Sequence, residues 1–201
     1  MGVKAAVLAV QGDFAEHAAM LKRLGVSCVL LRCREDLKAD YDALILPGGE
    51  STVQGKLLRD LDMYDTLKEQ IQAGLPVLAT CAGLILLADR IEDASERHLG
   101  TLPVTVRRNA YGRQLGSFHM QQEVRGIGCV PMTFIRAPFV TRVSPQVEVL
   151  AEVDGHIVGV RYKKQTAYAF HPELDEDLKV YEAFLRDCCG AQAVPAASGD
   201  R

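Results

Sequence analysis

No apolar run in this sequence approaches the ~20 residues that a membrane-spanning helix needs. Gly2-Val3-Lys4 leads directly into a strand-like run, without the basic and long apolar segments of a secretory signal. A surplus of positive charge is also absent, because the net charge is -3 at pH 7. We therefore expect a cytoplasmic protein that binds neither nucleic acid nor a membrane surface.

The sequence also lacks the paired cysteine spacing of zinc sites. Its six cysteines stand at positions 28, 33, 81, 129, 188 and 189. Without a secretory signal, we interpret them as reduced thiols. The composition that is present, with 48% hydrophobic and 24% charged residues over 201 positions, is typical of one globular domain with a sizeable core.

The first half of the sequence alternates between strand and helix patterns. Short apolar runs predict buried strands, and amphipathic patterns predict helices between them. The strands are expected at 3–10, 26–32, 41–47 and 75–80, and the helices at 14–24, 53–61, 64–73 and 83–91. This alternation indicates a parallel sheet with helices on both faces.

The pattern changes after residue 100. Several short β-type runs between 101 and 168, with a turn at Asp154-Gly155, predict antiparallel strands and hairpins. A closing helix is expected at 175–187, and the small and polar residues 190–201 predict a disordered tail. The predicted fold class is therefore α/β, with a single domain over residues 1–189. Its open, mostly parallel sheet is flanked by helices and has antiparallel strands in the second half.

Polar clusters follow three of the predicted strands, at 11–12, 47–51 and 80–83. In open α/β sheets, ligands bind beyond the carboxyl ends of the strands. Cys81 stands in the third cluster, between a buried strand and a helix. It is either a small hydrophobe in the core or a nucleophile at a tight turn, where the helix N-terminus favours the thiolate.

A cysteine nucleophile needs a histidine base, and the sequence offers five histidines. Four of them (17, 98, 119 and 156) are best explained as surface or hydrogen-bonded structural groups. His171 differs, because it ends an apolar strand-like run and Glu173 follows two residues later, close enough to orient the imidazole ring. The order Cys81, His171, Glu173 is thus a candidate catalytic triad.

Two further segments have both structural and functional interpretations. Pro47-Gly48-Gly49 is typical of a turn, but a glycine amide beside a nucleophile can also donate to an oxyanion. The arginines around 107–113 fit a solvated hairpin or a site for a substrate carboxylate or an acidic partner face. Arg136, amid apolar residues, is easier to explain near a site than in a core.

Taken together, these motifs resemble the triad-type (class I) glutamine amidotransferases, which have a flavodoxin-like fold. Within that class they resemble the glutaminase subunits of pyridoxal 5'-phosphate synthase, in vitamin B6 biosynthesis. The resemblance covers nearly the whole chain except the tail. Its motifs are "LAVQGDFAEH", "LILPGGEST", "TCAGLILLA", "RNAYGRQLGSF", "FIRAP" and "FHPEL".

The resemblance implies an activity and a role for each matching residue. Cys81 would be the nucleophile, His171 the general base and acid, and Glu173 its orienter. The implied oxyanion donors are the amides of Gly49 and Ala82, and the implied glutamine-binding residues are Gly49, Glu50, Ser51, Arg108, Ile135 and Arg136. No metal or cofactor is implied. The ammonia from L-glutamine would pass to a separate, barrel-shaped synthase subunit that makes pyridoxal 5'-phosphate.

Two other functions compete with this interpretation. A stand-alone cysteine hydrolase or stress-response protein of similar fold would need no ammonia acceptor, and nothing in it would require the arginine-rich segment. A catalytically silent binding subunit would not need the intact cysteine, histidine and glutamate. Small departures from the family pattern, at His119 and Ala169, lie beside the motifs and concern substrate and partner contacts.

Overall fold

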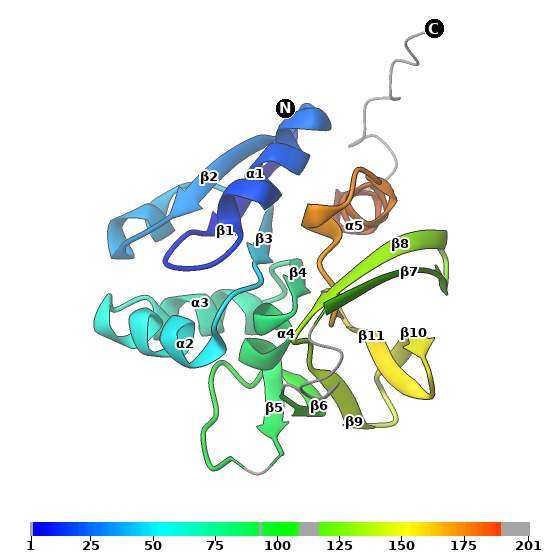
Figure 1. Cartoon of the computed structure of the whole chain (residues 1–201). Coiled ribbons are helices and arrows are strands. Elements are labelled where there is room, and N and C mark those ends of the chain that lie inside the picture. The colour runs from blue at the N-terminus through cyan, green and yellow to red at the C-terminus, as the bar shows by residue number, and fades with distance from the viewer. Residues whose placement is uncertain (1, 93, 109–116, 190–201) are drawn as a thin grey trace, which may run out of the picture.

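The computed structural model describes residues 2–92, 94–108 and 117–189. They form a ten-stranded mixed sheet and a separate two-stranded sheet (Figure 1). The strand order in the large sheet is β2-β1-β3-β4-β12-β11-β9-β6-β5, with β10 paired to β11. Within the described residues, no helix is both long and apolar enough to cross a membrane.

The predicted parallel sheet of the first half is confirmed. Its strands are β1 (Lys4–Leu8), β2 (Ser27–Leu31), β3 (Ala43–Leu46) and β4 (Val77–Thr80), and every neighbouring pair among them is parallel. Every residue of β3 and β4 is buried, as expected for strands covered on both faces.

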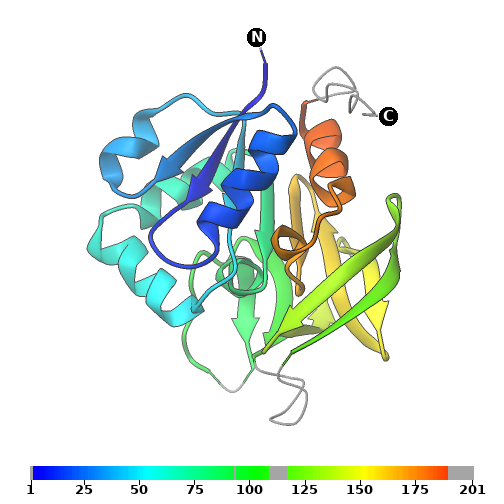
Figure 2. The ribbon, with the colours of Figure 1, turned by 45° about the horizontal axis from the view of Figure 1, so that its top comes forward.

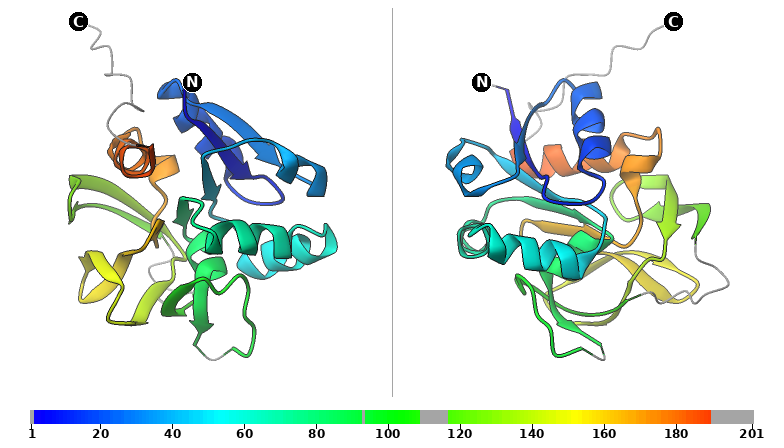
Figure 3. Two further views of the ribbon diagram at one scale, coloured as in Figure 1. Left: turned by 180° about the vertical axis from the view of Figure 1, so that it is seen from behind. Right: turned by 60° about the vertical axis from the view of Figure 1, so that its left-hand side comes forward.

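Helices cover both faces of this parallel region (Figures 1 and 3). On one face lie α1 (Phe14–Arg23) and α5 (Lys179–Cys189), and on the other α2 (Ser51–Asp60), α3 (Tyr64–Gln72) and α4 (Ala82–Leu87). A short 3-10 helix, η1 (Arg34–Lys38), follows β2. Turned forward, α1 and α5 lie side by side in front of the strands (Figure 2).

The helix predicted at 83–91 is wrong in its second half. It ends at Leu87, and the next residues form β5 (Ala88–Ile91), which pairs in parallel with β6 (Leu102–Arg107) at the sheet edge. The run "AGLILLA" is apolar throughout, and all six residues of α4 are buried. Periodicity therefore could not separate helix from strand, and the tertiary pairing with β6 decided the boundary.

The antiparallel second half is also confirmed. It contains β6, β9 (Phe139–Val143), β10 (Glu148–Val153), β11 (His156–Tyr162) and β12 (Gln165–Tyr168). The Asp154-Gly155 turn joins β10 to β11, with positive φ angles of 50° and 76°. Strand β9 had no separate indication in the sequence. Strand β12 pairs antiparallel with β11 but parallel with β4, so it joins the two halves.

The two-stranded sheet consists of β7 (Ser117–Val124) and β8 (Gly128–Ile135). Both strands lie within the stretch of β-type runs that the sequence predicts, and residues 109–116, just before β7, lie outside the described residues. The closing helix begins four residues later than predicted, at Lys179 instead of Asp175. Residues 175–178, which follow the 3-10 helix η2 (Pro172–Leu174), are not helical, and the Asp177 carboxylate accepts a hydrogen bond from the Lys179 amide. The predicted tail, 190–201, also lies outside the described residues.

Candidate active site

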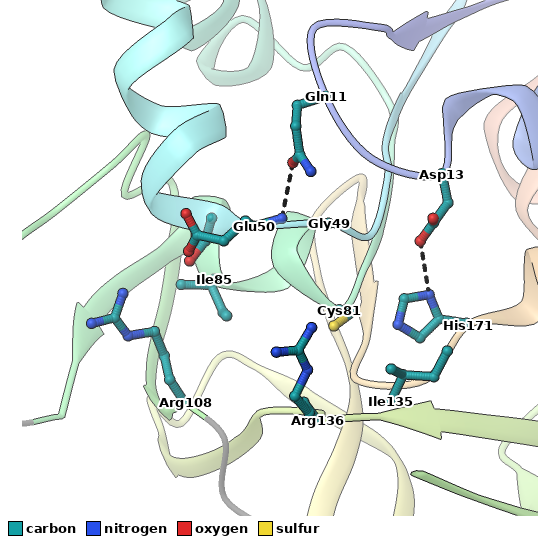
Figure 4. A pocket seen from close by; sticks show the side chains of 11 residues that line it. Gln11, Asp13, Gly49, Glu50, Cys81, Ile85, Arg108, Ile135, Arg136 and His171 are labelled. Atoms are coloured by element: carbon teal, nitrogen blue, oxygen red, sulfur yellow. Dashed lines mark hydrogen bonds and ion pairs between the residues drawn. The ribbon is translucent and has the colours of Figure 1, made fainter. Parts of the chain in front are cut away.

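A cavity of about 380 Å³ lies at the carboxyl edge of the parallel strands (Figure 4). It opens where the loops after β1, β3 and β4 meet the segment after β12 and the end of β8. The lining residues are Gln11, Asp13, Gly49, Glu50, Ser51, Cys81, Ile85, Arg108, Ile135, Arg136 and His171. The topology explains the meeting point, because parallel strands direct their carboxyl ends to one edge.

Cys81 stands on a sharp turn between β4 and α4. Its backbone has φ 45° and ψ -100°, a conformation that residues other than glycine rarely adopt. The turn is possible because α4 approaches β3 closely at Gly83, where an added Cβ would lie 2.2 Å from the Leu46 carbonyl oxygen. Cys81 is only 7% exposed, yet it lines the cavity. The geometry is that of a nucleophile elbow.

The Gly48-Gly49 loop is as tightly constrained as the elbow. A Cβ on Gly48 would lie 2.4 Å from His171 Cε1, so the histidine ring packs directly on this glycine. Gly49 has φ 145°, and a Cβ there would lie 2.6 Å from Gln11 Oε1. The next amide, that of Glu50, donates to the same Gln11 oxygen at 2.9 Å (Figure 4). Glycine at both positions lets the backbone approach the catalytic groups.

Glu50 begins helix α2 and faces the cavity. Its carboxylate accepts hydrogen bonds from the amides of Thr52 (3.1 Å) and Val53 (2.8 Å), as an N-cap residue does. Partial burial raises the pKa of Glu50, but these amides and the nearby Arg108 outweigh it, and the net pKa is lowered. Arg108 in turn donates to the Thr52 hydroxyl at 3.0 Å. An anion and a cation thus face the same end of the cavity.

His171 lies between a carboxylate pair and Cys81. Its Nδ1 is 2.7 Å from Glu173 Oε1 and 3.4 Å from Asp13 Oδ2, and Figure 4 shows the ring between Asp13 and the sulfur. Burial by itself lowers the pKa of His171, but hydrogen bonding to Asp13, Cys81 and Glu173, with the charge of Glu173, raises it to about 12. The other ring nitrogen, Nε2, makes no hydrogen bond of normal geometry to any described residue. It is therefore the nitrogen available to the thiol and to a substrate.

Glu173 is an anion behind the histidine. Burial raises its pKa, but the interactions with His17 and His171 outweigh burial and lower the pKa to about 2. The residue is 5% exposed and does not line the cavity. Its position suits a group that orients the ring without touching a ligand.

The donor atoms of Asp13, His171 and Glu173 lie within 4.8 Å of one another, the one such group among the residues that the structure describes. A metal ion is not required to explain this grouping. Two carboxylates beside one imidazolium form an ion pair by themselves, and the raised His171 pKa reflects it.

The structure brings together nearly all of the site residues that the sequence indicated. Eight of them line the cavity: Gly49, Glu50, Ser51, Cys81, Arg108, Ile135, Arg136 and His171. Glu173 contacts His171 from behind, and Ala82 is buried at the first position of α4. Arg107 does not line it and instead pairs with Glu92 at 2.5 Å. Arg113 lies outside the described residues.

Sequence reasoning missed Asp13, the buried partners of Glu173, which are His17 and Thr80, and Tyr181, which contacts His17. Asp13 directly follows the polar pair Gln11-Gly12 at a strand end, and this position was the available signal. The sequence alone indicates only a structural histidine at position 17. Its contact with residues more than 60 positions away carries no local signal in the sequence.

An elbow cysteine that faces a histidine–carboxylate pair at the carboxyl edge of a flavodoxin-like sheet is the arrangement expected of a class I glutamine amidotransferase. Comparison with known proteins agrees with this class. The chain belongs to the SNO glutamine amidotransferase family, which it matches over residues 7–190.

The curated relatives are similar over nearly their full length. A pyridoxal 5'-phosphate synthase subunit PdxT from Desulfitobacterium hafniense (strain DSM 10664 / DCB-2) is 56% identical over 193 residues, 96% of this chain and 97% of that protein. A PdxT subunit from Streptococcus pneumoniae (strain CGSP14) is 51% identical over 189 residues, 92% of this chain and 97% of its own.

Solved structures support the fold. A crystal structure of a glutamine amidotransferase superposes with a TM-score of 0.86 at 44% identity, covering 90% of this chain and 97% of its own. PurLQS from Thermotoga maritima reaches a TM-score of 0.68 at 16% identity, covering 93% of this chain and 99% of its own, and supports the fold alone.

Proposed function

We propose that this protein hydrolyses L-glutamine to L-glutamate and ammonia and supplies the ammonia for synthesis of pyridoxal 5'-phosphate. The observation that carries the proposal is the position of Cys81. It lies on a strained elbow in a cavity that also presents His171 Nε2. The family match and the PdxT relatives support the substrate and the use of the ammonia.

In the first half-reaction, the Cys81 thiol passes its proton to His171 Nε2, and its sulfur attacks the side-chain carboxamide carbon of glutamine. The carbonyl oxygen becomes an oxyanion, which the amides of Gly49 and Ala82 stabilise. His171 then gives its proton to the leaving nitrogen, the carbon–nitrogen bond breaks, and ammonia departs. A glutamyl thioester remains on Cys81.

In the second half-reaction, His171 takes a proton from water as the water oxygen attacks the thioester carbon. The carbon–sulfur bond then breaks, glutamate leaves, and the thiol and imidazole return to their starting state. Glu173 keeps Nδ1 of His171 protonated throughout, so that Nε2 is the nitrogen that exchanges protons in both halves.

The rest of the cavity would hold the substrate. The residues to which we assign glutamine binding all line the cavity: Gly49, Glu50, Ser51, Arg108, Ile135 and Arg136. The carboxylate of Glu50 suits the α-ammonium group of glutamine, and the guanidinium groups suit its α-carboxylate. Arg136, directly after β8, has a positive φ of 44°, a conformation that is rare for residues other than glycine and is often found at functional sites.

We further propose that a barrel-shaped synthase subunit receives the ammonia and activates the hydrolysis. The name of the PdxT relatives, a synthase subunit, supports a partner. Ammonia is wasted when no acceptor is docked, and the Gly48-Gly49 peptide can turn its amide toward or away from the oxyanion. We assign the protein to the cytoplasm, supported by thiols outside any disulfide at Cys28, Cys33, Cys81 and Cys129. Residues 1–189 are proposed as one glutamine amidotransferase domain.

The test is steady-state glutaminase kinetics of the purified chain, alone and with its cognate synthase subunit. We expect weak hydrolysis alone and a clear increase with the partner, and no hydrolysis by Cys81→Ala or Cys81→Ser in either condition. Labelling by a glutamine-like diazo-ketone should occur at Cys81, with none at Cys28, Cys33 or Cys129. Equal rates with and without the partner would contradict the gating and favour a stand-alone hydrolase. Near-normal activity of Cys81→Ala would overturn the nucleophile assignment.

A further inference from the structure

A chain of polar side chains continues from the triad into the core, away from the cavity. The Tyr181 hydroxyl lies 2.7 Å from His17 Nδ1, and His17 Nε2 lies 3.1 Å from the Thr80 hydroxyl. The Thr80 hydroxyl lies 3.4 Å from Glu173 Oε1, the same oxygen that contacts His171 at 2.7 Å. His17 Nε2 is itself 3.5 Å from that oxygen.

Every member of this chain is removed from solvent. Tyr181, His17 and Thr80 are each 0% exposed, and none of them lines the cavity. They come from three separate elements, α5, α1 and β4, which pack together only in the folded protein. Burying three polar side chains costs free energy unless their hydrogen bonds are made, so their meeting at one carboxylate needs an explanation.

The hydrogen bonds of this chain of side chains can all run in one direction, since the Thr80 hydroxyl donates to Glu173 and is free to accept from His17 Nε2. Tyr181 keeps its proton, because burial and the charge of Glu173 raise its pKa well above the usual value. With the imidazole proton on Nε2, the Tyr181 hydroxyl can donate to His17 Nδ1. That N–H donates to Thr80, and the Thr80 hydroxyl donates to Glu173. Each donor thus points toward the carboxylate that orients His171.

We propose that His17, Thr80 and Tyr181 are positioning residues of the glutaminase, holding Glu173 as an oriented anion from the buried side. The inference rests on the proposed function, since it assigns a role relative to the catalytic histidine. Glu173 Oε2 has no hydrogen-bond partner among the described residues. The carboxylate is therefore held through Oε1, by the chain of polar side chains on one side and by His171 on the other.

The charged and titratable groups around Glu173 come from three sides. His171 faces it within the same turn, His17 faces it from α1, and Tyr181 lies behind His17 on α5. Asp13 faces His171 from the cavity side, and its side chain is 36% exposed. Water competes for the hydrogen bonds of Asp13 but does not reach the buried polar side chains. Glu173, which these side chains hold, therefore constrains the orientation of the His171 ring more strongly than Asp13 does.

The first test compares His17→Gln with His17→Met in the complex with the synthase subunit. A glutamine amide nitrogen can occupy the place of Nε2 and donate to Thr80, whereas methionine has similar bulk and no donor. Loss of a hydrogen bond that supports a buried charge should lower kcat of His17→Met by about 10- to 100-fold with KM unchanged. His17→Gln should retain most of the activity.

The pH profile separates positioning from packing. Without the His17 donor, the Glu173 carboxylate takes up a proton more readily, so the acid limb of the kcat/KM profile of His17→Met should move to higher pH. His17→Gln should keep the profile of the unsubstituted protein. A defect of packing alone would lower thermal stability in both variants and leave the limb in place.

A milder pair removes one hydroxyl from a buried tyrosine. Tyr181→Phe should lower kcat by a few-fold and move the acid limb in the same direction, because His17 loses the donor that selects its tautomer. Tyr168→Phe is the matched control. Tyr168 is 1% exposed, and its charged neighbours are Arg161, Asp187 and Glu148 rather than the triad. It should leave the profile unchanged.

The outcomes distinguish this inference from the proposed function. If the unsubstituted protein hydrolyses glutamine and both His17 variants and Tyr181→Phe match it in kcat and pH profile, the positioning role is wrong. The same conclusion follows if His17→Gln and His17→Met lose activity equally without a shift of the acid limb. If the unsubstituted protein with its partner releases no ammonia from glutamine, the proposed function itself fails.

Discussion

The two halves of the sheet contribute different kinds of groups to the site. In the parallel half, β3 and β4 are buried at every position, and their loops contribute Cys81 and a set of backbone amides. In the antiparallel half, β12 is buried at every position too, but the segments after β12 and β6 contribute the side chains of His171 and Arg108, and the end of β8 in the neighbouring two-stranded sheet adds Arg136. The parallel half thus provides the nucleophile, the backbone amides and the carboxylates of Asp13 and Glu50, and the other half provides the histidine and the guanidinium groups.

The halves meet where β12 pairs with β4. In that pairing Tyr168 stands opposite Thr80. Thr80 directly precedes the nucleophile, and Tyr168 precedes the histidine by three residues. A short parallel ladder therefore sets the distance between the sulfur and the imidazole. The comparison teaches that the triad depends on a contact between the halves rather than on either half alone.

The largest expected loss of activity comes from substitutions of His171 and Glu173, which follow β12 in the antiparallel half. His171→Asn should lower glutaminase kcat by about a millionfold, and Glu173→Gln by about ten-thousandfold, as in triads where the orienting acid contributes less than the base. The histidine moves protons in both half-reactions, whereas Glu173 fixes its tautomer. Kinetics with the partner present and circular dichroism as the folding control provide the check. Equal losses would assign Glu173 a direct chemical role.

A backbone change in the parallel half should give a smaller but specific effect. Gly49→Ala places a Cβ 2.6 Å from Gln11 Oε1 at a φ of 145°, so the loop amide cannot reach the oxyanion. We expect the partner-stimulated rate to fall about a hundred- to a thousandfold, without loss of complex formation. Gly74→Ala is the control, because Gly74 also has a positive φ, 102°, but open space around it. If the partner still stimulates glutamine hydrolysis by Gly49→Ala, the conformational switch does not lie in this loop.

The smallest expected effect is on stability, and it tests the pairing between His171 and Glu173. The His171 pKa is raised from 6.5 to about 12, so its contribution is complete below pH 6.5 and is lost as pH rises toward 12. The Glu173 pKa is lowered from 4.5 to about 2, so its contribution is complete above pH 4.5 and is lost as pH falls toward 2.

The pair should therefore contribute most between pH 4.5 and 6.5. Chemical unfolding of Glu173→Gln across this range should show a loss of about 2 kcal/mol relative to the unsubstituted protein, shrinking toward pH 2. A constant difference at all pH values would mean that the carboxylate contributes by packing and not by charge.

The elements that the sequence predicted well are those with a strong local pattern. Strands β1 to β4, helices α1 to α3 and the Asp154-Gly155 turn were each indicated by an apolar run, an amphipathic period or a turn pair. The boundary between α4 and β5 was not, because an all-apolar run has no period to distinguish helix from strand. The late start of α5 at Lys179 was missed because residues 175–178 are polar enough to fit a first helical turn, whereas in the structure they are non-helical and the Asp177 carboxylate accepts from the Lys179 amide.

The same division holds within the site. The sequence by itself determined that Cys81, Gly49 and His171 are candidates, because each stands beside a strand end, where an open parallel sheet exposes its loops. It also indicated Glu173, since a carboxylate two residues from a histidine can reach the ring. These are local facts, written in a few consecutive residues.

Only the tertiary structure decided what surrounds them. Asp13 reaches His171 across the Gly48 loop, and His17 and Tyr181 approach Glu173 from helices far apart in the chain. Such contacts depend on how α1 and α5 pack against the sheet, and no local pattern encodes that packing. The sequence therefore determined which groups carry the chemistry, and the fold decided which charges and hydrogen bonds hold them, because electrostatic interactions depend on distance in space and not on distance along the chain.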